Sequence, residues 1–330
     1  MEAAIITTYR CINKCIMCNI WKYPTKIDEE FKPEILNKLP KLKFANITGG
    51  EPLLREDIEE IVEILTKKKA ERVVISTNGY FTEKIVALAK KFKNKNFGVR
   101  ISIEGLPAAN DELRGLKDCF DHGLRTLLEL HRLGLKDIGF GITVSDRNAK
   151  DMLELYELAK AMNVEFATAC VHNSYYFHKW DNKITKKDEV IKCFEELINE
   201  LLKTKRIKNW FRAYFNYGLV NYIKGNPRLL PCEAGTDMFF VDPWGNVIPC
   251  NGFDEANDEV IMGNLNNSSF EEIWNSEKAK KIRQLVKSCP KNCWMIGTAA
   301  PAIKKNILKV SLWVLKNKLK VLLGKRVCVD

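Results

Sequence analysis

The stretch that decides the fold is an apolar run and the loop behind it, Ala3-Ala4-Ile5-Ile6-Thr7-Thr8 and then Cys11-Ile12-Asn13-Lys14-Cys15-Ile16-Met17-Cys18. The run ends in β-branched residues and predicts a buried strand. The loop spaces three cysteines as C-x3-C-x2-C. Three thiolates can bind three irons of a cubane cluster and leave the fourth iron open to a small molecule. A zinc knuckle that awaits a distant fourth ligand is the alternative, although zinc sites favour C-x2-C pairs and histidine.

Similar short runs recur along the first half of the chain and alternate with segments of helical period. Both sets predict crossover units, in which parallel strands are joined by helices. The fold class is therefore α/β, with a sheet that is curled or doubly wound, and its chemistry is expected in the loops after the strands. The expected strands cover residues 3–8, 44–48, 72–76, 98–103, 138–144 and 164–170, and the expected helices 33–39, 55–69, 82–93, 119–134 and 149–162.

Polar segments follow four of these expected strands, and three of the four contain glycine. After the second strand stands Gly49-Gly50-Glu51-Pro52, after the third Ser76-Thr77-Asn78-Gly79, and after the fourth Ser102-Ile103-Glu104-Gly105 with Asn110-Asp111-Glu112-Leu113-Arg114-Gly115 behind it; the fifth is followed by 143–148. Together with the cysteine loop, these segments resemble, strand end by strand end, the motifs of the radical S-adenosylmethionine (radical SAM) superfamily.

The resemblance implies a partial (β/α)6 TIM-like barrel over residues 1–185. It implies that the chain cleaves S-adenosylmethionine reductively to a 5'-deoxyadenosyl radical that abstracts a substrate hydrogen. Cys11, Cys15 and Cys18 would bind the catalytic 4Fe-4S cluster. The residues that would bind S-adenosylmethionine are Gly49, Gly50 and Glu51 at its amino group, Ser102 and Arg114 at its carboxylate, Ser76 and Asn78 nearby, and Met17, in place of the usual aromatic residue, at adenine.

A second set of four cysteines lies near the C-terminus: Cys232, Cys250, Cys289 and Cys293. Four cysteines suffice for a second iron-sulfur cluster, and a structural zinc ion is the alternative. The C-x12-G-x4-C segment resembles the SPASM/Twitch extension of radical SAM enzymes, which implies a small hairpin-plus-helix domain over 230–297 and one auxiliary 4Fe-4S cluster. The expected hairpin covers 238–249 and the expected helix 269–287, and residues 186–229 form a helical connector.

An auxiliary cluster is useful where a substrate radical must lose an electron. The hypothesis we favour from the sequence is the oxidation of a sugar, cyclitol or lipid-linked glycan; the alternative is a peptide maturase that forms crosslinks or epimerises residues. A flavodoxin or ferredoxin would supply electrons. Cys170 and His172 follow the sixth strand and are the candidate catalytic residues, as hydrogen donor and proton acceptor, against the plainer expectation of core packing. A non-enzymatic electron carrier would lack the segments that face the cofactor.

Composition restricts the location and the partners. The chain has 330 residues, a net charge of +11, and eleven cysteines without a recognisable signal peptide, which indicates a reducing cytoplasm. Residues 301–326 supply eight basic residues and no acidic one, so the rest is close to neutral and nucleic acid is not an expected partner. The tail, 298–330, predicts a basic amphipathic helix that either contacts the inner face of a membrane through 301–326 or packs on the barrel.

Overall fold

The structure, a computed structural model, describes residues 1–253 and 259–329. Its centre is a curved sheet of nine strands in the order β6-β5-β4-β3-β2-β1-β7-β8-β9. The first six strands are parallel, as the sequence predicts, and the sheet does not close, so the fold class is confirmed. These strands are β1 (Glu2–Ile6), β2 (Phe44–Thr48), β3 (Val73–Thr77), β4 (Phe97–Ser102), β5 (Asp137–Val144) and β6 (Glu165–Cys170).

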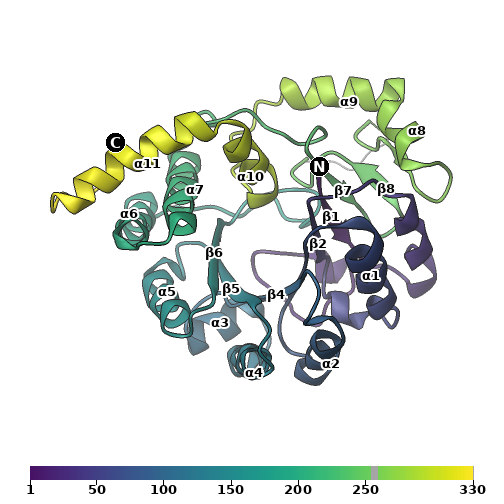
Figure 1. Cartoon of the computed structure of the whole chain (residues 1–330), viewed down its shortest axis with the longest axis horizontal. Helices are drawn as coiled ribbons and strands as arrows, with labels where there is room; N and C mark the ends of the chain where they lie inside the picture. Colours follow the sequence, from purple (N-terminus) through teal and green to yellow (C-terminus); the bar gives the residue numbers. More distant parts are fainter. Residues whose placement is uncertain (254–258, 330) are drawn as a thin grey trace.

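Helices cover the outer side of this arc of strands (Figure 1). Alternation along β1 explains the two sides of the sheet: Ala3 and Ile5 join the large core under the helices, whereas Ala4 and Ile6 join a small cluster inside the arc. The covering helices are α1 (Ile58–Ile64) with the π-helical turn η5 (Leu65–Lys69), α2 (Thr82–Phe92), α4 (Cys119–Arg132) and α5 (Met152–Ala161). Short 3-10 turns are η1 (Ile20–Lys22), η2 (Ile27–Glu29), η3 (Pro33–Lys38), η4 (Pro52–Leu54) and η6 (Ala149–Asp151).

The predicted C-terminal hairpin extends the main sheet. β7 (Met238–Val241) lies parallel to β1, with Glu2 opposite Met238, and β8 (Asn246–Ile248) runs antiparallel beside it. β9 (Gly263–Asn264) pairs with β8. The segment with the second cysteine set is therefore joined to the barrel strand that precedes the first set.

The remaining helices connect the two ends of the sheet. α6 (Lys187–Lys203) and α7 (Ile207–Lys224) pack together beyond β6, and α10 (Ile296–Lys305) contacts both α7 and β7. The opening of the barrel between β6 and β7 is therefore covered by α7 and α10. The chain ends in α11 (Ile307–Leu322), which lies across α6 and α7 (Figure 1). Throughout residues 1–253 and 259–329, every helix is too short or too polar to cross a lipid bilayer.

One expectation for a helix was wrong, and one helix was not expected. The helix expected over 269–287 is two, α8 (Phe270–Asn275) and α9 (Glu277–Lys287), because Ser276 is extended (ψ 152°) and caps the second by accepting a hydrogen bond from the Ala279 amide at 3.1 Å. The sequence did not predict α3 (Pro107–Arg114), which has Pro107 at its first position and Gly115 in the left-handed conformation after its last.

Candidate active site and cluster-binding residues

A cavity of about 380 Å³ lies inside the arc, at the carboxyl ends of the parallel strands. Its wall brings together Cys11, Cys15 and Cys18 with most of the predicted cofactor-facing residues. Among the described residues, no group of three His, Cys, Asp or Glu side chains is placed to hold a single metal ion. The predicted site residues in the wall, besides the cysteines, are Met17, Gly49, Gly50, Ser76, Asn78, Ser102, Arg114, Cys170 and His172.

The glycines after β2 are required by the cysteine loop itself. A Cβ atom at Gly49, whose φ is 150°, would lie 2.4 Å from the Thr8 carbonyl oxygen, and one at Gly50 would lie 2.2 Å from the Arg10 carbonyl oxygen. The two loops are bonded at this crossing, since the Gly50 amide donates to Thr8 at 2.7 Å. Glycine here therefore fixes the start of the cysteine loop against the loop after β2.

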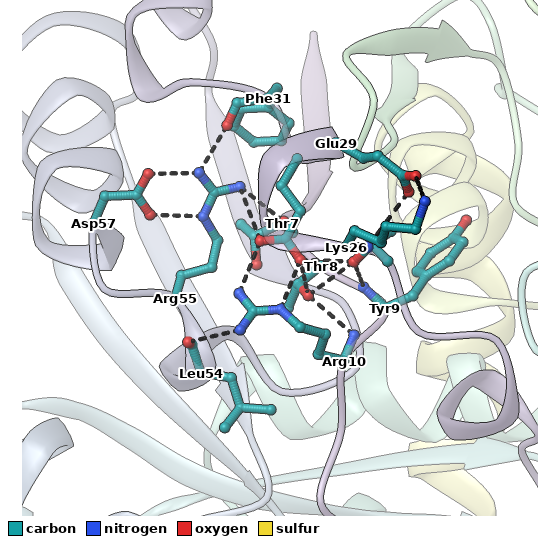
Figure 2. A network of polar contacts seen from close by, with 12 residues as sticks. Thr7, Thr8, Tyr9, Arg10, Lys26, Glu29, Phe31, Leu54, Arg55 and Asp57 are labelled. Atoms are coloured by element: carbon teal, nitrogen blue, oxygen red, sulfur yellow. Dashed lines mark hydrogen bonds and ion pairs between the residues drawn. The ribbon is translucent and has the colours of Figure 1, made fainter.

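A buried ion network fastens the same crossing from behind (Figure 2). Glu30, with a side chain only 3% exposed, accepts two hydrogen bonds from Arg10, at 2.9 and 2.8 Å, and others from Thr8 and Thr25. Arg55 donates to the carbonyls of Thr7, at 2.9 Å, and of Phe31, at 2.7 Å, and pairs with Asp57. Each buried charge in the network has partners, which a low-dielectric site demands.

Glu51 does not line the cavity, which differs from the role implied for its side chain. It is fully buried behind the wall, where its carboxylate accepts hydrogen bonds from the Leu53 amide, the Thr77 hydroxyl and the Asn78 amide at 3.1, 2.8 and 2.7 Å. Burial raises its pKa, and these three donors oppose that rise. Its side chain is thus a brace between the loops after β2 and β3.

Arg114 and Glu104 form an ion pair in the wall of the cavity. Both are buried, and Arg114 Nη1 lies 3.4 Å from Glu104 Oε1, while Glu104 also accepts from the Thr143 amide at 2.5 Å. Burial opposes the charge on Arg114, but nearby Cys15 and Glu104 raise its pKa above the usual value. Arg114 Nε is buried and has no partner among the described residues. A free N–H on a guanidinium fits a ligand carboxylate, so this side of the cavity fits the amino-acid end of S-adenosylmethionine.

Cys170 and His172 stand where β6 ends. His172 Nδ1 lies 3.2 Å from the Cys170 carbonyl, which fixes the proton on Nδ1, and Nε2 is buried with no partner among the described residues. Burial lowers the pKa of His172, so the ring is neutral at pH 7. Burial raises the pKa of the Cys170 thiol, which stays protonated. The histidine thus presents an acceptor nitrogen and the cysteine an S–H group.

The second cysteine set lines a cavity of its own, of about 480 Å³. Cys232, Cys250, Cys289 and Cys293 all lie in its wall. The Gly252 amide donates to the Cys250 sulfur at 3.1 Å, which is the contact that amides make to cluster-binding thiolates. Four sulfur donors in one enclosed wall fit an iron-sulfur cluster, which is the auxiliary group that the sequence predicts.

The two cavities meet at Cys293, which lines both. The neighbouring Trp294 is held between the barrel and the second cysteine set. Its indole N–H donates to the Phe215 carbonyl at 2.9 Å, and Arg228 lies over its ring at 5.1 Å. Cys293 is therefore the ligand candidate that lies in the wall of the central cavity.

The sequence analysis missed several residues of this site. Asn13, within the cysteine loop, joins the Asn78 side chain at 2.5 Å, and Tyr176 donates to the Gly49 carbonyl at 3.1 Å. Asn13 could have been noted from its place between Cys11 and Cys15. Tyr176 carries no signal in the sequence, because it comes from a loop after β6 that only the fold brings to Gly49.

Comparison with known proteins places two family domains on the chain. Residues 5–159 match the family model of the radical SAM superfamily, and residues 232–294 match the SPASM model, described as an iron-sulfur cluster-binding domain. The second match covers all four C-terminal cysteines and the strand β7 that pairs with β1, and it favours iron-sulfur ligation there over zinc.

Curated relatives agree with this assignment. The chain is 30% identical over 269 residues to AdoMet-dependent heme synthase of Methanosarcina barkeri, across 72% of this chain and 70% of that protein. It is 27% identical over 290 residues to mycofactocin maturase MftC of Mycolicibacterium smegmatis, across 84% and 71%. It is also 27% identical over 210 residues to Fe-coproporphyrin III synthase of Methanosarcina barkeri. That match covers 60% of this chain and only half the length of that protein.

Solved structures share the fold at low sequence identity. Native anSMEcpe with bound AdoMet and Kp18Cys peptide has a TM-score of 0.64 at 17% identity, covering 96% of this chain and 99% of that one. Streptococcus suis SuiB bound to precursor peptide SuiA has a TM-score of 0.62 at 16% identity, covering 86% and 66%. From the motifs, the cavity and these comparisons together, the chain belongs to the radical SAM superfamily and carries a SPASM iron-sulfur cluster-binding domain.

Proposed function

We propose that this radical SAM enzyme modifies a peptide, by abstracting a hydrogen atom from a side chain or Cα atom that enters the central cavity. The observation that carries the proposal is the small cavity shared by Cys11, Cys15, Cys18, Arg114 and Cys293. It joins the catalytic cysteines to the second cysteine set across a space of about 380 Å³.

In this proposal Cys11, Cys15 and Cys18 bind the catalytic 4Fe-4S cluster. When reduced by a flavodoxin or ferredoxin, that cluster supplies the electron that cleaves S-adenosylmethionine to methionine and the 5'-deoxyadenosyl radical. Arg114 would bind the cofactor carboxylate through Nε, which has no partner among the described residues, with Ser102 contributing, and Met17 would contact adenine. Ser76, Asn78 and the backbone of Gly49 and Gly50 complete the wall, which excludes water from the reacting groups.

His172 has the proposed role of proton acceptor. If the substrate radical is oxidised, a proton leaves with the electron, and the neutral His172 Nε2 is an acceptor without a competing partner among the described residues. Cys232, Cys250, Cys289 and Cys293 bind the auxiliary cluster, which supplies an electron acceptor at the cavity wall. In an epimerisation, the S–H group of Cys170 would instead give a hydrogen atom to the substrate radical and become a thiyl radical, which one electron from the flavodoxin or ferredoxin and one proton would return to the thiol.

Size supports a peptide over a larger substrate. Ligand pockets run from about 300 to 1,000 Å³, and the cavity, at about 380 Å³, lies near the lower end of that range. Peptides are bound in two structures with this fold, those of anSMEcpe and SuiB. The curated relatives named above carry no name that supports our first preference, the oxidation of a sugar, cyclitol or lipid-linked glycan, and we replace it with the peptide alternative.

Conversion of a porphyrin is a second candidate function, favoured by one observation, the 30% identity to AdoMet-dependent heme synthase. A tetrapyrrole macrocycle is far larger than one side chain. A porphyrin must place a whole macrocycle in the cavity, whereas a peptide can place a single side chain there.

The test measures 5'-deoxyadenosine formed by the anaerobically reconstituted, reduced enzyme. We expect a peptide fraction from the source cells to raise the rate above the uncoupled rate, and protease treatment of that fraction to abolish the rise. Fe-coproporphyrin III and a glycan fraction are the comparison substrates. Stimulation by the porphyrin alone supports the second candidate, and stimulation that survives protease but is lost after periodate contradicts the peptide proposal.

A further inference from the structure

Helix α11 has two apolar faces. One face packs on α6 and α7 through Val310 and Val314, which are 0% and 3% exposed, and through Trp313, which stacks on Tyr217 with ring centroids 5.0 Å apart. Lys318 secures the same face by donating to the carbonyl of Thr204 at 2.9 Å. The part of the tail that follows is also tied down, since the Val327 amide donates to Asn199 Oδ1 at 2.9 Å. The orientation of α11 on the body is thus fixed.

The opposite face carries a stripe of leucines in solvent. Five of them, from Leu308 to Leu322, are spaced three or four residues apart, and Leu323 follows directly as the C-cap, so that the six lie within an arc of about 100° around the helix axis. A side chain that is 57–80% exposed at six neighbouring positions is unusual, because soluble proteins scatter their exposed apolar residues. The leucine stripe consists of Leu308, Leu312, Leu315, Leu319, Leu322 and Leu323.

Basic residues border the leucine stripe on one flank and at its end. Lys309, Lys316 and Lys320 lie between the stripe and the docked face, and Lys325 and Arg326 follow the helix. Within the described part of the chain, Lys316, Lys320, Lys325 and Arg326 form no ion pair, whereas Lys304 and Lys305 are paired with Glu2 and Glu233. Residues 301–326 contain no acidic residue.

The exposed leucines and their basic border together indicate which kind of surface the stripe binds. A second copy of the chain would bring an identical basic border against the first, so like charges would oppose the contact. An anionic lipid surface supplies both missing complements, because acyl chains accept leucines in the interfacial plane and headgroups neutralise the flanking lysines. Lysine stems can also extend along the apolar face while their ammonium groups reach the headgroups.

We infer that α11 is a preformed membrane-surface anchor, whose leucine stripe enters the interface of an anionic bilayer while the rest of the enzyme stays at that surface. The inference does not depend on the substrate of the active site. The sequence leaves packing on the protein and membrane contact as alternatives for the tail. In the structure one face of α11 packs on α6 and α7 while the leucine stripe stays exposed, so both can hold at once.

The experiment is co-sedimentation of the full-length protein with vesicles of phosphatidylcholine, with and without 30% phosphatidylglycerol. We expect binding to the anionic vesicles that weakens as salt is raised. The variant Leu312→Gln/Leu315→Gln/Leu319→Gln should lose binding by at least about tenfold, because the apolar insertion is removed. Leu285→Gln, at an exposed leucine on α9, is the matched control and should bind like the wild type.

Charge is tested separately by Lys316→Glu/Lys320→Glu, which should weaken binding to anionic vesicles by at least about tenfold. Lys90→Glu/Lys93→Glu, on α2 and just after it, changes the net charge equally and should have a much smaller effect. All four variants should keep the wild-type rate of uncoupled 5'-deoxyadenosine formation. The inference is overturned if the leucine variant binds vesicles as tightly as the wild type. It is also overturned if the wild-type protein does not bind vesicles and instead forms a dimer through the leucine stripe or binds an acidic protein.

Discussion

Arg114 is a buried guanidinium with one nitrogen, Nε, that no described group accepts from. Among the described residues its only carboxylate partner is Glu104, at 3.4 Å, which is long for an ion pair. An incompletely paired buried charge costs folding free energy, and the cost is recovered when a ligand carboxylate binds. The protein therefore holds Arg114 ready for a ligand.

Replacement of Arg114 should affect cofactor affinity more than cluster assembly. Arg114→Lys removes the planar fork, and Arg114→Gln removes the charge as well, so we expect the KM for S-adenosylmethionine to rise by about 10- to 100-fold, the equivalent of about 1.5–3 kcal/mol. Arg147→Lys, at the exposed ion pair with Glu112, is the control and should leave KM unchanged. The measurement is steady-state formation of 5'-deoxyadenosine, with the iron content determined for each variant. Equal KM values for Arg114→Lys, Arg114→Gln and Arg147→Lys would show that Arg114 does not bind the cofactor.

The protonation state of His172 predicts how turnover depends on pH. Burial lowers its pKa below the usual 6.5, so the neutral acceptor form persists to lower pH than in a free histidine. Coupled turnover should thus stay flat through neutral pH and fall only on the acid side. His172→Asn should cut product formation by about 100-fold or more while the uncoupled cleavage of S-adenosylmethionine continues. The exposed His131→Asn is the control, and a variant at position 172 with full product yield would contradict the role.

The same pKa direction predicts a stability effect. Below pH 6.5, the usual histidine pKa, His172 binds a proton in the unfolded chain but stays neutral in the folded protein. The neutral, buried His172 therefore contributes stability above pH 6.5, and this contribution is lost as the pH falls towards the lowered pKa of the folded state. In His172→Asn this part of the acid destabilisation should disappear, as measured by denaturant melts between pH 5 and 8.

Residue types could be predicted at this site, but side-chain directions could not. Both Glu51 and Glu104 stand in loops after strands, and the motif assigned the cofactor contact to Glu51. Only the backbone geometry shows that Glu51 points behind the wall to Thr77 and Asn78, whereas Glu104 faces Arg114 in the cavity. Hydrogen-bond partners distant in sequence decide such directions.

At the scale of elements, the cysteine loop depends on the network around Glu30. Glu30→Gln leaves the half-buried Arg10 and the buried Arg55 without their shared carboxylate, and loss of one partner from a buried pair costs about 3–5 kcal/mol. We expect a loss of that order in the free energy of unfolding, and a preferential loss of iron from the catalytic cluster. Glu29→Gln, at the neighbouring exposed ion pair with Lys26, should change stability by less than about 1 kcal/mol.

Guanidinium melts of the reconstituted protein under anaerobic conditions measure both variants. If Glu30→Gln and Glu29→Gln have the same stability, the network does not hold the loop.

Elements with strong local signals could be predicted from the sequence. The runs of β-branched residues gave the strands to within one or two residues, and β2 in full, because a buried parallel strand has few polar positions. The missed helix α3 is short and polar, and its Pro107 start and Gly115 stop lie only eight residues apart. The break at Ser276 depends on a cap that competes locally with continuing the helix.

At the scale of the whole molecule, helix α7 of the connector meets the SPASM domain in a close contact of Gly218 with Trp294. A Cβ atom at Gly218 would lie 2.1 Å from the indole ring. Alanine usually stabilises a helix relative to glycine by about 1 kcal/mol, but Gly218→Ala should lower the melting temperature and displace Trp294. Gly123→Ala in α4, where the nearest atom is 3.4 Å from the new Cβ, should be neutral or stabilising. Equal melting temperatures for the two variants would mean that Trp294 moves freely.

This long-range assembly could not be predicted from the sequence. The pairing of β7 with β1 joins residues more than two hundred positions apart, and nothing in either strand specifies the other. The grouping of the four C-terminal cysteines could be predicted, because their spacing resembles a known domain. The place of Cys293 in the wall of the active-site cavity could not, because it follows from the packing of α7, α10 and Trp294.

The most direct test of the central claim is to measure iron, zinc and 5'-deoxyadenosine on anaerobically reconstituted protein, for the wild type, Cys15→Ala and Cys232→Ala/Cys250→Ala. We predict about eight irons in the wild type and about four in each variant. Uncoupled formation of 5'-deoxyadenosine should persist in Cys232→Ala/Cys250→Ala and vanish in Cys15→Ala. Four irons with bound zinc in the wild type, and no 5'-deoxyadenosine, would contradict the assignment of one catalytic and one auxiliary cluster.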